Sequence, residues 1–389
     1  MQTASIRIDI CYDAEKVTDY WRMLEANAVD SPFQSSGWLA VYRAAMEHSG
    51  KGWGEPVFVV VFEHDRPVAI YPFVMVRGCL TTSIQWLAAN ISDYNGPAVD
   101  RDFSTRIPPD LFSRVIGNLR ASRPEITYAS LTCVPQSCPG LPQRVSPVGR
   151  SFRADYDSHA LALQRNWKEY YKQLRSKDTR QRLNSKLAGL RKAGDFKFAR
   201  VKVPAKRVEV AEQIMQWKAD RLAAAGDRNP FGRPGRETDI RRTILIAVAR
   251  SDNPIEVFAI YLDGKPVAGM LALLTNSVFH LWVTSFDART NPRFSVGTLL
   301  LLKTIELAAR SGYSYYDFLS GDEEYKKDWC DIRIPLWHHL IPFGFKGSLV
   351  CAAMSARRGV KSILARPPYA KHMIRSSRKA AKRFHRTLF

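Results

Sequence analysis

The stretch "VFAIYLDGKPVAGMLALL", Val257–Leu274, contains two apolar runs around a tight polar turn, which is the pattern of a β-hairpin. The same pattern occurs in the first half of the chain as "VFVVVFEHDRPVAIYPFVM", Val57–Met75. In both copies the turn ends in a basic residue followed by proline, and Val-Ala comes next. A hairpin repeated in each half predicts two related domains, with a chance likeness as the alternative.

Segments with helical and strand patterns alternate around both hairpins. Helical spacing occurs at residues 35–48, 110–123, 166–194, 207–226, 236–251 and 296–312, and β-rich runs occur at 83–88, 125–134, 195–203 and 313–319. A chain of 389 residues is long enough for two domains. We therefore predict an α/β fold of two tandem domains, each a mixed sheet flanked by helices.

The boundary between these domains is predicted in the Pro-, Arg- and Ser-rich stretch at residues 139–151. We expect an N-terminal domain over residues 1–150 and a second domain over 151–345. A basic, helical tail is expected over 346–389.

The composition is that of a globular protein, with 46% hydrophobic and 11% aromatic residues, but the charge is unusual. A net charge of +21 and a pI near 9.8 indicate an anionic partner. Nucleic acid, an acidic membrane surface and a phosphate-rich cofactor would all fit. The sequence argues against nucleic acid, because it contains no helix-turn-helix, zinc-finger or RNA-recognition motif.

The positive charge is concentrated in two segments. Between Arg165 and Lys192 there are ten Lys or Arg residues and two acids, and a solvated helix face is the plain explanation. After Asp331 there are 13 Lys or Arg residues and no acid. Residues 347–368 mix apolar and basic side chains, which predicts an amphipathic helix at an anionic membrane surface. We therefore expect the chain to attach peripherally to an anionic membrane surface.

Other features favour a cytoplasmic location without metal. The six cysteines form no zinc-binding set, and reduced structural thiols are the expected state. The N-terminus lacks a basic start and an apolar core, so no secretory signal is expected. The uncharged stretch Val267–Phe286 is about long enough to span a bilayer, but its "TNS" turn favours two strands instead.

The stretch "RFSVGTLLLLKTIELA", from Arg293, predicts a phosphate site at the start of a long helix. Exposed N–H groups and the positive end of the helix dipole bind anions there. The cofactor-binding candidates are Arg293, Ser295, Val296, Gly297 and Thr298. The alternative is that Ser295 only caps the helix and Gly297 only packs.

Directly after this helix, "YYDFLSGDEEYKKDW", Tyr315–Trp329, carries an apolar run into a cluster of ionisable residues. A strand ending at Leu319 would place them at the carboxyl end of a sheet, where open α/β folds bind ligands. The catalytic candidates are Asp322, Glu324, Tyr325 and Lys326, with a salt-bridged surface turn as the alternative. An acid beside a phenol and an ammonium can deprotonate an amine and stabilise an oxyanion.

Two further pairs are candidates for substrate binding. Lys218 and Arg221 lie on adjoining faces of a predicted helix and could meet an anionic substrate, although a solvated face explains them equally well. Asp93 and Tyr94 belong to the polar loop "ISDYNGP", which could border a cleft.

Taken together, these motifs resemble those of the CelD/BcsL acyltransferases of the GNAT superfamily, a bacterial family named for a cellulose-biosynthesis protein and related to the Fem peptidyltransferases. The resemblance spans about Pro32 to Pro342. It is carried by "SPFQSSGWLAVY", "SDYNGP", "WKEYYKQLRSKDTRQRLNSKLAGLRKAGDFKFARV", "LDGKPVAG", "SVGTLL" and "YYDFLSGDEEYKKDW". A similar lysine ends the second domain of the Fem relatives, which draws attention to Lys326.

The resemblance implies two GNAT-like domains, the second of which binds acyl-CoA as co-substrate, with no permanently bound cofactor. The phosphate loop of GNAT enzymes is usually Gln/Arg-x-x-Gly-x-Gly/Ala. Here Arg293 is followed by Val296 and Thr298 at the two small-residue positions, so the loop departs from that pattern. The acceptor implied is an amine of an envelope sugar or lipid.

Several functions stay open at this point. The leading hypothesis is CoA-dependent N-acylation of an amino sugar in an exopolysaccharide precursor, with Glu324 or Asp322 assisting deprotonation. A lipid amine such as a sphingoid base is the other acceptor. A Fem-like transferase using aminoacyl-tRNA and a non-catalytic membrane scaffold are the remaining alternatives.

Overall fold

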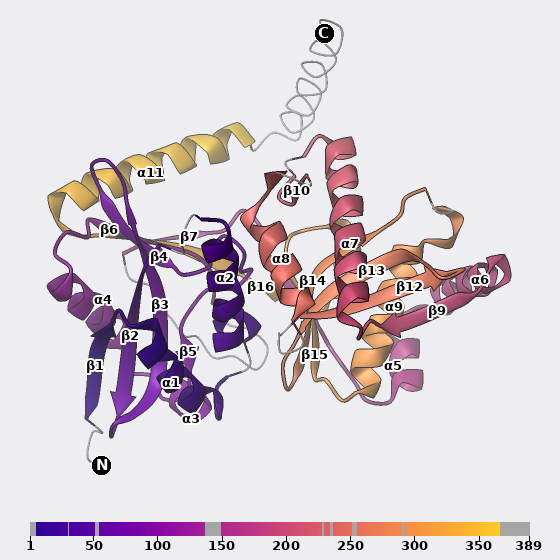
Figure 1. Cartoon of the computed structure of the whole chain (residues 1–389), viewed down its shortest axis with the longest axis horizontal. Helices are drawn as coiled ribbons and strands as arrows, with labels where there is room; N and C mark the ends of the chain where they lie inside the picture. Colours follow the sequence, from indigo (N-terminus) through magenta and orange to yellow (C-terminus); the bar gives the residue numbers. More distant parts are fainter. Residues whose placement is uncertain are drawn as a thin grey trace, which may run out of the picture.

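The computed structural model describes residues 5–29, 31–50, 54–136, 149–227, 229–233, 236–250, 255–289 and 292–365. These residues form two large mixed sheets flanked by helices, which lie side by side in Figure 1. The predicted α/β class and the predicted pair of mixed sheets are confirmed.

The two sheets have the same sequence of neighbours. The first follows the order β1 (Ile6–Cys11), β2 (Glu55–Glu63), β3 (Arg66–Arg77), β4 (Thr82–Trp86), β6 (Tyr128–Pro135), β17 (Leu336–Pro342) and β7 (Arg150–Arg153), and β5 (Ala98–Val99) pairs with β3. The second follows the order β9 (Phe196–Arg200), β12 (Ile255–Leu262), β13 (Lys265–Leu274), β14 (Val278–Phe286), β15 (Tyr315–Ser320), β8 (Ser158–Ala162) and β16 (Ile332–Ile334). In each sheet the fourth and fifth strands are parallel and the other pairs are antiparallel.

The repeated hairpins occupy equivalent places in the two sheets. The β2–β3 pair shifts register between Val61 and Phe62, and the β12–β13 pair shifts between Ile260 and Tyr261. Both two-residue turns have positive φ at each position, through His64-Asp65 in one and Asp263-Gly264 in the other. Such turns match the twist of antiparallel strands. The repeat read from the sequence is therefore a repeat in structure.

The chain crosses between the sheets twice. It passes from β7 in the first sheet to β8 in the second, and later from β16 in the second sheet back to β17 in the first. Strand β17 lies between β6 and β7. The predicted segment 151–345 therefore supplies strands to both sheets.

The prediction of one continuous helix over residues 166–194 is wrong. Residues 166–194 form two helices, α5 (Trp167–Leu174) and α6 (Lys177–Ala193). Arg175 between them is extended, and its guanidinium carbon lies 3.7 Å from the centre of the Trp329 ring. Ser176 then caps α6 by accepting a hydrogen bond from the Thr179 N–H. This cap and the extended residue before it end one helix and begin the next.

Helices fill the space between and beside the sheets (Figure 1). The largest core cluster joins both halves, because α1 (Ala14–Glu25) and α2 (Ser36–His48) of the first half pack in it with α7 (Pro204–Ala225) and α8 (Asp239–Ala249) of the second. Helix α9 (Val296–Arg310) covers the other face of the second sheet, and α4 (Leu111–Ser122) belongs to the outer core of the first. The short helices α3 (Arg101–Ser104) and α10 (Glu324–Trp329) follow strands.

The stretch Val267–Phe286 forms the β13–β14 pair, as its turn predicted. Within the part of the chain that the structure describes, no helix is long and apolar enough to cross a membrane. The predicted amphipathic helix is present as α11 (Gly344–Ala365), which runs along the first half. Residues 366–389 of the predicted tail lie outside the described residues.

Candidate active site

Strands β14 and β15 diverge soon after they meet. Their parallel pairing covers only Val278–His280 against Tyr315–Asp317, although β14 continues to Phe286. Beyond His280, none of the described strands pairs with β14 on that side. Because the two strands run in the same direction, the opening between them faces their carboxyl ends. It leaves backbone N–H and C=O groups of β14 available to a ligand.

A bulge in β14 lies at this opening. Leu281 pairs with Ala272 and Val283 pairs with Leu271, so Trp282 is the extra residue on its strand. The Trp282 ring packs edge-on against Trp38 of the first half, with centroids 5.0 Å apart. The first half therefore borders the opening.

The end of β14 leads to the start of α9. The N–H groups of Val296 and Gly297 precede the first hydrogen bonds of this helix, which Thr298 and Leu299 donate to the Ser295 carbonyl. Ser295 has a left-handed backbone, with φ of 50°, and its side chain does not cap the helix. Ser295 thus occupies the N-cap position, as the alternative proposed, but it does so through its carbonyl alone.

Positive side chains surround this helix start. Lys186 of α6 donates a hydrogen bond of 2.6 Å to Ser295 Oγ, and the exposed Arg293 lies over the Phe294 ring. An ammonium group beside the positive end of a helix dipole is unfavourable unless an anion is also bound. The helix start is therefore suited to a phosphate group.

Gly297 packs closely against a neighbouring side chain, which was the alternative to a role in cofactor binding. A Cβ atom at this position would lie 2.6 Å from the Phe286 ring. The Phe286 ring also lies near Arg221 of α7, whose guanidinium carbon is 5.7 Å from the ring centre. Phe286 thus lies close both to the helix start and to Arg221 of α7.

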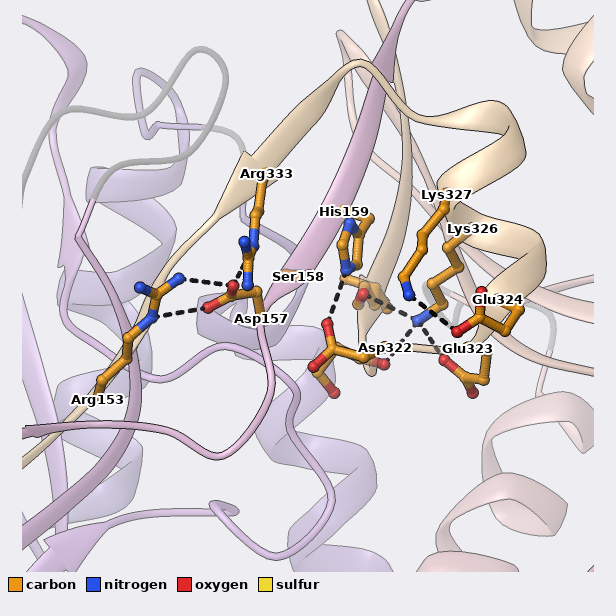
Figure 2. A network of polar contacts seen from close by, with 12 residues as sticks. Arg153, Asp157, Ser158, His159, Asp322, Glu323, Glu324, Lys326, Lys327 and Arg333 are labelled. Carbon is orange, nitrogen blue, oxygen red and sulfur yellow. Dashed lines mark hydrogen bonds and ion pairs between the residues drawn. The ribbon is translucent and has the colours of Figure 1, made fainter. Parts of the chain in front are cut away.

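The end of β15 leads to the turn that holds Lys326. The side chain of Lys326 is 2% exposed, and its ammonium group donates to the carbonyls of Leu319 (3.1 Å) and Ser320 (2.7 Å). Glu323 pairs with the same ammonium at 3.0 Å (Figure 2). Burial alone would raise the pKa of Glu323, but the charge of Lys326 lowers it.

The other catalytic candidates have partners other than Lys326. Glu324 is 87% exposed and pairs with Lys327 on the outer side of α10 (Figure 2). Asp322 lies 3.0 Å from Nε2 of His159, whose hydrogen bond lowers the Asp322 pKa against the effect of burial. Tyr325 packs near Phe318, and burial raises its pKa. Because Glu324 is exposed and paired with Lys327, it is a weak candidate for the base that deprotonates the amine.

The loop that carries Asp93 and Tyr94 reaches from the first half into the second. Ser320 Oγ donates a short hydrogen bond to Asp93, which places this carboxylate beside the Lys326 turn. The Tyr94 hydroxyl donates to the buried Asp317 carboxylate at 2.9 Å and lies 2.6 Å from Ser158 Oγ. Both residues therefore border the end of β15.

Lys218 approaches the same cluster from α7. Burial lowers the pKa of Lys218, and the neighbouring charges are those of Arg221, Glu323, Lys326 and Asp93. Among the described residues its ammonium group has no hydrogen bond or ion pair. The structure thus brings Lys218, Lys326 and Asp93 together, three residues that are far apart in the sequence.

Sequence reasoning missed several members of the site. Ser320 and Glu323 belong to the quoted turn, and the three-residue spacing of Glu323 and Lys326 could have indicated their pairing. Lys186 belongs to a helix with many basic residues, so its sequence position did not distinguish it from the others. The buried His280, whose Nδ1 lies 3.4 Å from Asp317, gave no signal in the sequence because its partner is on another strand. In the described part of the chain, no three His, Cys, Asp or Glu residues are grouped as metal ligands.

Residues 177–327 match the family model described as "Acetyltransferase (GNAT) domain". Among solved structures, FemX has a TM-score of 0.53 at 10% identity, over 86% of this chain and 95% of that one. L-PGS from Bacillus licheniformis has a TM-score of 0.49 at 10% identity, over 86% and 93%. The C-terminal domain of a putative lysylphosphatidylglycerol synthetase from Agrobacterium fabrum gives 0.49 at 12%, over 88% and 97%.

No curated protein matches the chain. At these identities the FemX comparison shows the fold alone, whereas the family match rests on the sequence of the second half. That match includes α6, β13, the α9 start and Lys326, which are the elements around the divergent strands. Residues 177–327 thus resemble a GNAT-type acetyltransferase domain, and the fold of the chain is similar to that of FemX.

Proposed function

We propose that the chain is a CoA-dependent N-acyltransferase of the CelD/BcsL type, which transfers an acyl group to an amine of a cell-envelope substrate. The observation that carries this proposal is the divergence of β14 and β15 after His280 and Asp317. The α9 start follows one strand and the Lys326 turn follows the other. A donor bound between the strands would meet a phosphate site at one end and a charged cluster at the other.

Acyl-CoA has the chemistry for this opening. Its diphosphate would bind the N–H groups of Val296 and Gly297 together with Lys186 and Arg293. The amide groups of its pantetheine arm would pair with the open edge of β14 in the manner of an added strand. The thioester would then lie beside the Trp282 bulge, where backbone N–H groups can stabilise an oxyanion.

The reaction is a direct transfer. The acceptor nitrogen attacks the thioester carbon, a C–N bond forms, and the C–S bond breaks as the CoA thiol leaves. Lys326 holds the turn beside the path of attack and supplies positive charge there. No covalent enzyme intermediate is needed, and Cys330, whose thiol pKa is raised by burial, is poorly suited to form one.

The acceptor we favour is the amine of an amino sugar in an exopolysaccharide precursor. A lipid amine such as a sphingoid base is the second candidate. Lys218 and Arg221 would bind a phosphate of a lipid-linked acceptor, since both cations border the cluster.

We also propose that the protein works at the cytoplasmic face of the inner membrane. Helix α11 packs on the first sheet through Cys351 and leaves Phe345 and Leu349 exposed by 80% and 57%. No acid follows Asp331 in the sequence. An apolar row beside basic residues is the surface that anionic lipid attracts.

The donor site is tested by CoA binding to Lys186→Glu, with Lys192→Glu on the same helix as the matched control. We expect Lys186→Glu to weaken CoA binding about tenfold or more, equivalent to at least ~1.4 kcal/mol. Lys192 is exposed near the far end of α6, and its reversal should have little effect. Isothermal titration measures both, and equal losses would show that only net charge matters.

Turnover is measured as thiol release from acetyl-CoA and palmitoyl-CoA with glucosamine and with sphinganine. Release that requires one amine supports the proposal and selects the acceptor class. No thiol release, together with ribonuclease-sensitive transfer from aminoacyl-tRNA to the same amines, would instead favour an aminoacyl-tRNA donor. CoA binding without any turnover would favour the non-catalytic scaffold.

A further inference from the structure

A carboxylate from the first half lies at the reaction end of the second half. Asp93 follows β4, more than 200 residues before Ser320, yet Ser320 Oγ donates a hydrogen bond to its Oδ1. Ser320 is the last residue of β15, and its carbonyl also accepts a hydrogen bond from Lys326. One residue thus links the Asp93 carboxylate to the buried ammonium.

The loop that holds Asp93 is hydrogen-bonded to both sheets. Tyr94 is anchored to Asp317 and Ser158 of the second sheet. Asn95 donates from its backbone N–H to the Cys133 carbonyl at 2.9 Å and from its side chain to the Thr132 carbonyl at 3.1 Å. A carboxylate next to two such anchored residues keeps its position without help from substrate.

The surroundings make Asp93 a stronger base than an ordinary aspartate. Burial raises the pKa of its carboxyl to about 6, against the hydrogen bond from Ser320 and the charge of Lys326. The other titratable and charged groups facing it are Asp317 of β15, Glu323 before α10, Lys218 of α7, Cys133 of β6 and Tyr156 before β8.

The neighbouring carboxylates are ion-paired or hydrogen-bonded to other groups. Glu323 is paired with Lys326, and Asp322 is hydrogen-bonded to His159. Asp317 is buried and accepts hydrogen bonds from Tyr94 and from the Leu319 N–H. Asp93 is half-buried, and within the described part of the chain its hydrogen-bond donor is the neutral Ser320 hydroxyl, so one of its oxygens can still accept a proton.

We propose that Asp93 is the general base of the transferase, so that the first half completes the catalytic site of the second. This inference rests on the proposed function. Asp93 takes one proton from the incoming ammonium, which frees the lone pair of the nitrogen for attack on the thioester. As the C–N bond forms and the C–S bond breaks, the second proton of the nitrogen ends on the departing CoA sulfur. Asp93 then returns its proton to water.

The test compares Asp93→Asn and Asp93→Glu with Asp19→Asn, an exposed control that removes the same charge from α1. The assay is thiol release from acetyl-CoA or palmitoyl-CoA with glucosamine or sphinganine between pH 5 and 9. We expect Asp93→Asn to lower kcat/KM at pH 7 by about 100-fold or more, with unchanged affinity for CoA. Asp93→Glu should recover part of this loss.

The pH profile separates a base from a structural residue. Wild-type activity should level off above the Asp93 pKa near 6, whereas the Asn variant should keep rising until the amine itself is deprotonated. An Asn variant with wild-type rate and profile would overturn the role of Asp93 and leave the proposed function standing. A wild-type protein that releases no thiol with any of these amines would overturn both.

Thermal unfolding provides a second measurement that does not depend on turnover. The folded-state pKa of Asp93 lies above the ordinary value near 4, so the fold prefers the protonated carboxyl, and stability from this group is lost as pH rises from about 4 through 6. Asp93→Asn should therefore have a higher Tm than wild type at pH 8 and no advantage at pH 4. A lower Tm at pH 8 would show that the residue is structural and would contradict the proposal.

Discussion

At the scale of single residues, the buried ammonium group of Lys326 is the central feature of the candidate site. A fully buried ammonium is costly unless its charge and its hydrogen bonds are satisfied. Two carbonyls and Glu323 meet that requirement, and together they fix the turn that follows β15. The same contacts make Lys326 an organiser of the site more than a free group waiting for substrate.

Lys326→Met should therefore affect stability as well as turnover. The apolar side chain fills similar space but leaves the Leu319 and Ser320 carbonyls without their donor, which costs about 1–3 kcal/mol. Lys327→Met, next in the sequence but largely exposed, should cost less than about 0.5 kcal/mol. Urea denaturation measures both changes. Equal effects at the two positions would contradict the buried role of Lys326.

The sequence identified Lys326, Asp93 and Tyr94 as candidates, but it could not assign their partners. Glu323 and Glu324 are adjacent and chemically identical, and only the direction of each side chain on the turn separates them. Local spacing predicts pairs within one helix. It contains no information on Ser320 and Asp93, which meet because two distant segments pack together.

At the scale of elements, helix α11 presents apolar side chains to solvent. Phe345 and Leu349 lie one turn apart on its outer face, and Gly347 packs so closely on the first sheet that a Cβ would meet the Thr127 carbonyl. The orientation of α11 is therefore set by its inner face. Its outer face is free to contact a bilayer.

Replacement of Phe345 and Leu349 by Asp should reduce binding to vesicles that contain phosphatidylglycerol. The change removes apolar contact and adds negative charge at the same surface. The control is Leu80→Asp, because Leu80 is 77% exposed in the turn between β3 and β4. Sedimentation with anionic and phosphatidylcholine vesicles measures the difference. Unchanged binding to anionic vesicles by the double variant would exclude α11 as the contact.

The elements that the sequence predicted well are those with local signals. Both hairpins were recognised from their turns, and α9 and α11 from their apolar spacing. The short strands β7, β8 and β16 were missed, because each pairs with residues far along the chain. The break between α5 and α6 was missed for a similar reason, since the contact of Arg175 with Trp329 is not local.

The whole molecule is held together by a core that both halves share. Residues of α1 and α2 belong to the same buried cluster as residues of α7, α8, β12 and β13. Polar contacts cross the same boundary, as Tyr94 with Asp317 does. We therefore expect one cooperative unfolding transition for the folded chain.

Tyr94→Phe tests this coupling. The variant leaves the buried Asp317 carboxylate without the phenol donor, which should lower the free energy of unfolding by about 1–3 kcal/mol while keeping a single transition. Tyr12→Phe, at an exposed position whose hydroxyl is hydrogen-bonded to Ser122 and Arg123 of the first half, is the control. Calorimetry reports both the midpoint and the number of transitions. Two separate transitions in the wild type would contradict the shared core.

The place of β17 between β6 and β7 has a consequence for how the protein is made. On the ribosome, the strands β1 to β7 emerge long before residues 336–342 are translated, so the place between β6 and β7 stays empty until that segment has been made. The amino-terminal half cannot mature independently as it leaves the exit tunnel. A nascent chain stalled before Leu336 would expose the unpaired edge of β6 and attract chaperones.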